Sequence, residues 1–187
     1  MKEVLYIHGY NSSGSTGRSL EKLCDFTKVH HFSIPVNPDE AIEKVNKYLN
    51  NHPEISLIVG SSLGGFITSQ ITGYMKLMIN PCMVPQVELP KLGCDKEIAD
   101  LYTKYSMVDK TADYEDRVST MLLFGTKDEL FSYKKLCTTI YGNKNIGTME
   151  GVKHHLTEKD LSEFIVPKIK YMLTDFSKQL FEHFENI

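Results

Sequence analysis

The sequence has no tryptophan, no excess of positive charge and no long hydrophobic run. Its formal net charge of -3 argues against a nucleic-acid partner, because nucleic-acid binders usually carry a basic face. No apolar stretch reaches the ~20 residues that a membrane span requires. The first residues also lack the apolar core and the cleavage site of a signal peptide. We therefore expect a cytoplasmic protein without a membrane span or a nucleic-acid partner.

Cysteine is scarce, and its spacing excludes the common cysteine-based sites. No two cysteines lie within C-x-x-C spacing, and none stands beside a histidine in a zinc-binding pattern. We expect four free, structural thiols in a reducing compartment, and no metal site or organic cofactor. The four residues are Cys24, Cys82, Cys94 and Cys137.

The length and composition fit one soluble domain that spans residues 1–187. Of the 187 residues, 41% are hydrophobic and 24% are charged, which is ordinary for a globular protein with a single core. This composition excludes a disordered, collagen-like or coiled-coil chain.

Apolar runs and amphipathic stretches alternate along the chain. The expected strands are residues 3–7, 29–35, 55–59, 76–79, 118–124 and 145–149, and the expected helices are 19–28, 38–50, 66–73, 98–107, 129–140 and 161–184. Such alternation predicts an α/β fold of three layers, with a mostly parallel sheet of about six strands. Sites in such sheets form at the carboxyl ends of the strands.

A G-x-S-x-G motif centred on Ser62 follows the third expected strand, between Gly60 and Gly64. A nucleophilic serine on a tight strand-to-helix turn needs small neighbours two residues away, and the amide of Leu63 can then stabilise an oxyanion. A chance match would occur in about one in twenty random chains of this length. The position between an apolar run and a helix favours the nucleophile.

A serine nucleophile needs an acid and a base, which in this type of fold follow it in that order. Asp128 follows the fifth expected strand, where the acid belongs, although an aspartate there could also cap the next helix. Glu129 is the weaker candidate, since it already enters the expected helix. The pair His154 and His155 follows the sixth strand.

Only one histidine of this pair can face Ser62, because neighbours on an extended loop point in opposite directions. His154 has the apolar Leu156 two residues later, which can anchor the loop, whereas His155 has Thr157. We therefore expect His154 to be the base and His155 to be solvated. The other histidines precede Ser62 or lie near the C-terminus.

The loop after the first strand, from His8 to Ser13, would face Ser62 across the end of the sheet. The backbone N–H of Tyr10 or of Asn11 could supply a second oxyanion donor, and we expect His8 to be structural. The same loop partly matches a phosphate-binding loop, but Ser15 replaces the lysine that contacts the phosphates. Nucleotide binding is therefore the weaker interpretation.

These segments together resemble the α/β-hydrolase superfamily and, more closely, the small, cap-poor bacterial esterases of the YqiA-like family. The matching pieces are LYIHGYNSSGS, VGSSLGGF, INP, LLFGTKDEL and EGVKHHLTEKD. The resemblance implies a truncated hydrolase sheet, with Ser62 as nucleophile, Asp128 as acid and His154 as base. It implies hydrolysis of carboxylic esters or thioesters without a metal or organic cofactor.

The sequence therefore predicts a serine hydrolase of small acyl esters or thioesters that works through an acyl-enzyme, with the amides of Tyr10 and Leu63 binding the oxyanion. An amidase or peptidase with the same triad, and a non-catalytic binding protein of this fold, are the alternatives. Residues 81–117 interrupt the alternation and are rich in apolar side chains. We expect them to form a small lid or to border the acyl pocket, with a plain packing layer as the equal alternative.

Overall fold

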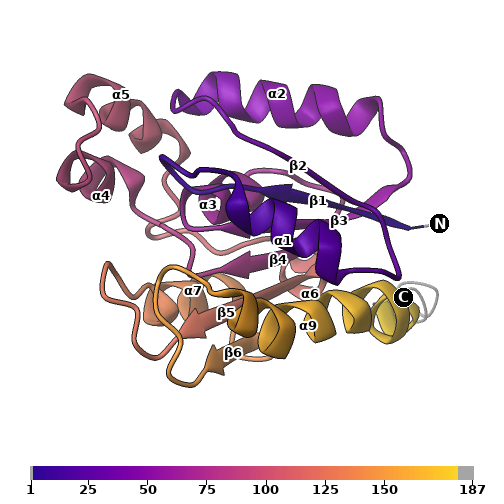
Figure 1. Cartoon of the computed structure of the whole chain (residues 1–187). Coiled ribbons are helices and arrows are strands. Elements are labelled where there is room, and N and C mark those ends of the chain that lie inside the picture. The colour runs from indigo at the N-terminus through magenta and orange to yellow at the C-terminus, as the bar shows by residue number, and fades with distance from the viewer. Residues whose placement is uncertain (1, 181–187) are drawn as a thin grey trace.

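The computed structural model describes residues 2–180, which form a sheet with helices on both faces (Figure 1). The strand order is β2-β1-β3-β4-β5-β6, and every pairing between neighbours is parallel. The strands are β1 (Glu3–Ile7), β2 (Val29–Phe32), β3 (Ile55–Ser61), β4 (Met75–Ile79), β5 (Thr120–Gly125) and β6 (Ile146–Met149). The predicted α/β fold is thus confirmed.

Alternate residues of the central strands enter two different cores, as the pleat requires. Val4 and Tyr6 pack with the face covered by α1 (Ser15–Leu23) and the C-terminal helical segment. Leu5 and Ile7 pack with the face covered by α2 (Pro38–Asn50) and α3 (Leu63–Ser69). On that second face, α7 (Lys134–Tyr141) covers β4 and β5. Figure 1 shows the helices on both sides of the sheet.

The predicted helix at 38–50 is confirmed to the residue, because the sequence places a capping asparagine and a proline at its start. Asn37 accepts hydrogen bonds from the N–H groups of Asp39 (2.9 Å) and Glu40 (3.4 Å). Pro38 occupies the first helical turn, where its missing N–H costs nothing.

Two predicted helix starts were wrong by four residues or more. The first helix begins at Ser15 rather than at residue 19, after Gly14 in a left-handed conformation with a φ of 77°. The helix expected from residue 129 begins only at Lys134. Asp128 explains the second error, because its carboxylate accepts the N–H groups of Leu130 (2.9 Å) and Phe131 (3.2 Å) and holds them in a loop.

The C-terminal helical segment runs through α8 (Glu158–Asp160), η2 (Leu161–Ile165), α9 (Val166–Tyr171) and η3 (Met172–Phe176). The two η elements are π-helical turns, and Pro167 stands in the first turn of α9. The predicted end of this helix lies outside the described residues.

Residues 81–117 contribute to four short helices: α4 (Pro85–Lys91), α5 (Lys96–Asp100), η1 (Leu101–Tyr105) and α6 (Tyr114–Ser119). Figure 1 shows α4 and α5 on the side to which the strand arrows point. Met83 joins the core beneath α7, and Tyr102 packs edge-on against Phe66 with ring centroids 5.5 Å apart. These side chains belong to the cores of the domain.

All four cysteines are free and buried, as the sequence predicted. None of the helices within residues 2–180 is both long enough and apolar enough to cross a membrane.

Candidate active site

Ser62 stands at the turn from β3 to α3 in a strained conformation, with a φ of 54° and a ψ of -121°. A positive φ is rare outside glycine and persists only where the surroundings enforce it. Here the Ser62 N–H donates to the carbonyl of Ile79 (3.0 Å), and the Ser62 carbonyl accepts the N–H of Cys82 (3.0 Å). Strand β4 and the chain after it therefore hold the turn from the side.

The two flanking glycines are required by close backbone contacts. A Cβ on Gly60 would lie 2.3 Å from the carbonyl oxygen of Gly64, and a Cβ on Gly64 would lie 2.1 Å from the carbonyl oxygen of Ile7. Both distances are far inside van der Waals contact. Helix α3 can thus start against β1 only with glycine at these positions, which accounts for the G-x-S-x-G spacing.

The loop from β1 to α1 passes directly beside Ser62. A Cβ on Gly9 would lie 3.0 Å from the Cβ of Ser62, so glycine permits this approach. In the part of the chain that the structure describes, neither the N–H of Tyr10 nor that of Leu63 donates to a backbone carbonyl. Both N–H groups are therefore available to a ligand at Ser62.

His154 and Asp128 form a hydrogen-bonded pair at the ends of the loops after β6 and β5. The distance from His154 Nδ1 to Asp128 Oδ2 is 2.8 Å, and the two side chains are only 3% and 4% exposed. The second Asp128 oxygen is the acceptor for Leu130 and Phe131 described above. The ring of Phe131 packs edge-on against His154, with centroids 4.7 Å apart.

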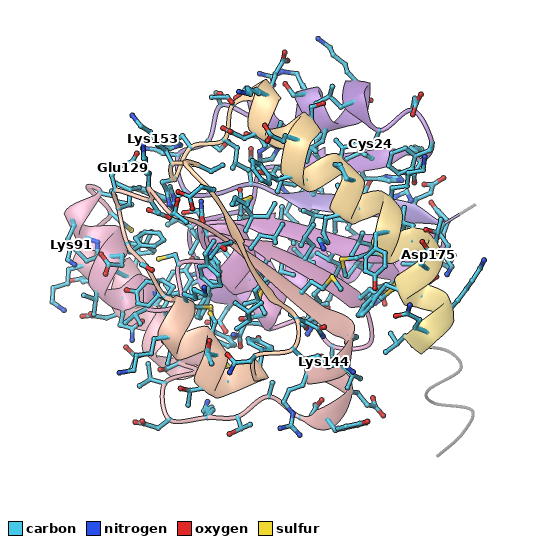
Figure 2. All side chains as sticks on the ribbon, turned by 90° about the horizontal axis from the view of Figure 1, so that it is seen from below. Cys24, Lys91, Glu129, Lys144, Lys153 and Asp175 are labelled. Atoms are coloured by element: carbon cyan, nitrogen blue, oxygen red, sulfur yellow. The ribbon has the colours of Figure 1, made fainter. Side chains whose placement is uncertain are left out.

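The neighbours of this pair play other structural parts. His155 is exposed and meets His154 only edge-on. The carboxylate of Glu129 accepts the backbone N–H of His154 (3.2 Å), and this hydrogen bond lowers the pKa of Glu129. Figure 2 shows Glu129 and Lys153, from the two loops, at the end of the molecule away from Asp175. Glu129 thus holds the histidine loop rather than the imidazole.

Asn80, which is not among the site residues predicted from the sequence, joins the loop that carries Asp128 to the loop that carries His154. Its side chain accepts the N–H of Gly125 (2.7 Å) and donates to the carbonyl of Lys153 (3.2 Å). It is 3% exposed and adopts a φ of 43°. The available signal was the Asn-Pro pair at the end of β4, since asparagine tolerates the left-handed region.

His8 stabilises the loop from β1 to α1, which passes beside Ser62, through its contact with Ser12. It is buried, with Nδ1 3.3 Å from the Ser12 hydroxyl and Nε2 3.4 Å from His31 Nδ1. Burial, together with the charges of His31 and Arg18, lowers the pKa of His8 to about 4. His8 is therefore neutral at neutral pH, and its contacts agree with the structural part expected for it.

Ser62 and His154 line one cavity of about 300 Å³. The other lining residues are Tyr6, Ser61 and residues 9–13, 15–16 and 155–156. Residues 81–117, all of them described, are not among the residues that line this cavity. Met83 and Tyr102 are buried in the cores, whereas Val87, Leu92, Leu101 and Val108 are exposed. A function of this segment as a lid or as a border of the acyl pocket stays a prediction.

One group of three possible metal ligands occurs in the described residues, at the opposite end of the sheet. Atoms of His30, His52 and Glu54 lie within 4.8 Å of one another. His30 already contacts Glu3 (2.5 Å) and Tyr48 (2.7 Å), and His52 contacts Glu54 (2.9 Å). These hydrogen bonds account for the cluster, and we assign no metal to it.

Comparison with known protein families identifies the family to which this chain belongs. The sequence pattern of the uncharacterised protein family UPF0227 matches residues 3–172. The chain belongs to this family. The match runs from β1 into η3 and so includes every element of the cavity at Ser62. The family resemblance expected from the sequence is thus confirmed.

Solved structures place this UPF0227 protein in the α/β-hydrolase fold. Alpha/beta hydrolase domain-containing protein 10 from mouse matches with a TM-score of 0.73 at 14% identity, over 92% of this chain and 90% of that one. A monoacylglycerol lipase from Paleococcus ferrophilus matches with 0.61 at 15% identity, over 91% and 93%. Est1E from Butyrivibrio proteoclasticus matches with 0.62 at 13% identity, over 92% and 88%. At these identities the likeness establishes the fold.

Proposed function

We propose that this UPF0227 protein is a serine hydrolase that cleaves small carboxylic esters or thioesters through an acyl-enzyme. One observation carries the proposal: His154, which is hydrogen-bonded to the buried carboxylate of Asp128, lines the same cavity as Ser62, and Ser62 stands on a strained turn. A binding module has no need of this combination. The likeness in fold to esterases and lipases also supports it.

Each group then has a defined part in the reaction. The Ser62 oxygen attacks the carbonyl carbon while His154 Nε2 takes the serine proton. Asp128 accepts a hydrogen bond from His154 Nδ1, which fixes the tautomer and stabilises the imidazolium as it forms.

The carbonyl oxygen gains negative charge as the serine attacks. The free N–H groups of Tyr10 and Leu63 are the donors that we assign to it, and losing one such donor typically costs about a hundredfold or more in rate. The intermediate then expels the alcohol or thiol, which leaves with the proton from His154. Water, deprotonated in turn by His154, releases the acid from Ser62.

A fluorophosphonate probe tests the proposal directly, because it phosphonylates activated serines. The unchanged protein should be labelled at Ser62, and Ser62→Ala should lose both the label and ester hydrolysis, with kcat falling at least about a thousandfold. Ser61→Ala is the matched control and should still be labelled, since the Ser61 hydroxyl is engaged by Tyr6 at 2.6 Å. Labelling that survives in Ser62→Ala but not in Ser61→Ala would refute the assignment.

Comparing an ester, a thioester and an amide of the same acid separates the proposal from its nearest rival. Ester or thioester turnover that clearly exceeds amide turnover supports it, whereas the reverse order indicates an amidase or peptidase. No labelling and no turnover of any of the three would indicate a binding protein.

A further inference from the structure

Most residues that line the cavity beside Ser62 carry a hydroxyl group. Besides Ser62, they are Tyr6, Tyr10, Ser12, Ser13, Ser15, Thr16 and Ser61. Apolar surface in the lining comes from Leu156 and from the rings of Tyr6 and Tyr10. An acyl pocket for alkyl chains would need the opposite composition, with aliphatic side chains on most of its wall.

Several of these hydroxyls are held in place by other polar groups. Tyr6 contacts Ser61 at 2.6 Å, and Ser12 accepts the N–H of Gly14 at 3.2 Å. Ser13 donates to Ser15 at 3.2 Å. The Ser15 hydroxyl accepts this bond and so keeps its own proton for a ligand. These contacts make the polar wall a preorganised surface.

Asn11 adds an amide whose hydrogen bonds are open. Its side chain has no hydrogen-bond partner among residues 2–180, and its backbone is held at a φ of 55°. Asn11 and Ser15 are both exposed, so water satisfies them while the cavity is empty. Together they present donors and an acceptor at the mouth of the cavity.

The energetic consequence depends on what displaces this water. An alkyl group cannot replace the hydrogen bonds of the water that it displaces, and each polar group that it buries without a partner costs about 1–3 kcal/mol. A substrate hydroxyl can replace them. Sites that hydrogen-bond a substrate hydroxyl therefore reject the analogue that lacks it far more strongly than an apolar pocket rejects an added hydroxyl.

We propose that this cavity selects substrates in which a short hydroxylated group is attached to the scissile ester or thioester, over alkyl groups of the same shape. The volume of about 300 Å³, at the lower end of ligand sites, limits that group to a few carbon atoms. The inference rests on the proposed serine-hydrolase function and names its substrate class.

Two pairs of esters test this selection, one on each side of the scissile bond. On the acyl side, methyl glycerate is compared with methyl 2-methylbutanoate. On the alcohol side, glycerol 1-monobutyrate is compared with 2-methylbutyl butyrate. Within each pair the hydroxyls are replaced by methyl groups of similar size. We expect kcat/KM of the hydroxylated ester to be at least about tenfold higher in one pair.

The variant Ser15→Ala tests whether the hydroxyl-bearing lining of the cavity causes the preference for hydroxylated esters. It should lower the ratio of hydroxylated to alkyl turnover about three- to tenfold, the worth of one hydrogen bond, with Ser62 still labelled by a fluorophosphonate. Ser162→Ala, at an exposed serine of η2 outside the cavity, is the matched control and should leave the ratio unchanged.

The outcomes distinguish a failure of this substrate class from a failure of the proposed serine-hydrolase function. Equal or faster turnover of the alkyl ester in both pairs, with Ser62 labelled, overturns the substrate class and leaves the hydrolase intact. A ratio that Ser15→Ala does not move also overturns it. Loss of all labelling and turnover in the unchanged protein refutes the hydrolase itself.

Discussion

His154 and His155 are adjacent in the chain but occupy different environments. The ring of His154 is buried and bonded to Asp128, while His155 is exposed. His154→Ala should therefore lower kcat about ten-thousandfold or more, because it removes the proposed base. His155→Ala should cost less than about tenfold.

Ester hydrolysis at a fixed pH measures both variants, and circular dichroism checks that each is folded. The reverse ranking would move the proposed base to His155. Equal retention of activity in the two variants would eliminate the triad mechanism.

Asn80 makes no hydrogen bond to Ser62 and does not line the cavity, yet we infer that it positions His154. Asn80→Asp keeps an acceptor for Gly125 but loses the donor to Lys153, and aspartate tolerates the left-handed φ. Misplacement of a reacting group by about 1 Å can cost a hundredfold, so kcat should fall with little change in KM. Asn80→Gly, which also tolerates the φ but loses both contacts, should fall further.

Steady-state kinetics measured well below the unfolding temperature separate positioning from mere destabilisation. A purely structural Asn80 would lower the unfolding temperature and leave kcat per folded molecule unchanged, and that result would contradict the inference.

At the scale of elements, caps decide where helices start. The side chain of Asn37 satisfies two N–H groups of α2, so Asn37→Ala should lower the free energy of unfolding by about 1 kcal/mol. Asn46 is exposed in the middle of the same helix, where alanine is the better helix former. Urea denaturation should therefore show Asn46→Ala to be neutral or slightly stabilising. Equal losses in the two variants would exclude the cap as the cause.

The strands and the order of the site residues could be predicted, because they depend on local patterns. Apolar runs mark buried parallel strands, and the candidate site residues follow these strands directly in the chain. The start of α7 could not be predicted, since it depends on a carboxylate that turns back on its own loop. Nor could the partner of Lys76, a fully buried lysine in β4 that pairs with Asp116 at 2.7 Å. That pair joins residues 40 positions apart, a distance over which local patterns carry no information.

Within the whole molecule, His8 makes stability depend on pH. Its pKa falls from 6.5 to about 4 on folding, so the unfolded chain binds a proton at higher pH than the native protein does. Native stability is therefore unaffected by this group above about pH 6.5 and decreases as the pH falls from there towards 4. Below both values no further loss arises from His8.

Urea unfolding at a series of pH values measures this effect. His8→Gln should flatten the decrease between pH 6.5 and 4, even if it lowers stability at pH 7 through lost packing beside Tyr6 and His31. An equally steep decrease in the variant would assign the acid sensitivity to other groups.

The all-parallel sheet also has a consequence for a chain that is still being synthesised. Among the described residues, strand β6 pairs with β5 alone and leaves the ribosome after the other five strands of the sheet. A nascent chain thus carries the serine of the β3 turn for more than 90 residues before the imidazole from the β6 loop exists. Until that loop docks, the serine is an ordinary alcohol. The order of translation therefore keeps the proposed nucleophile inactive until the sheet is complete.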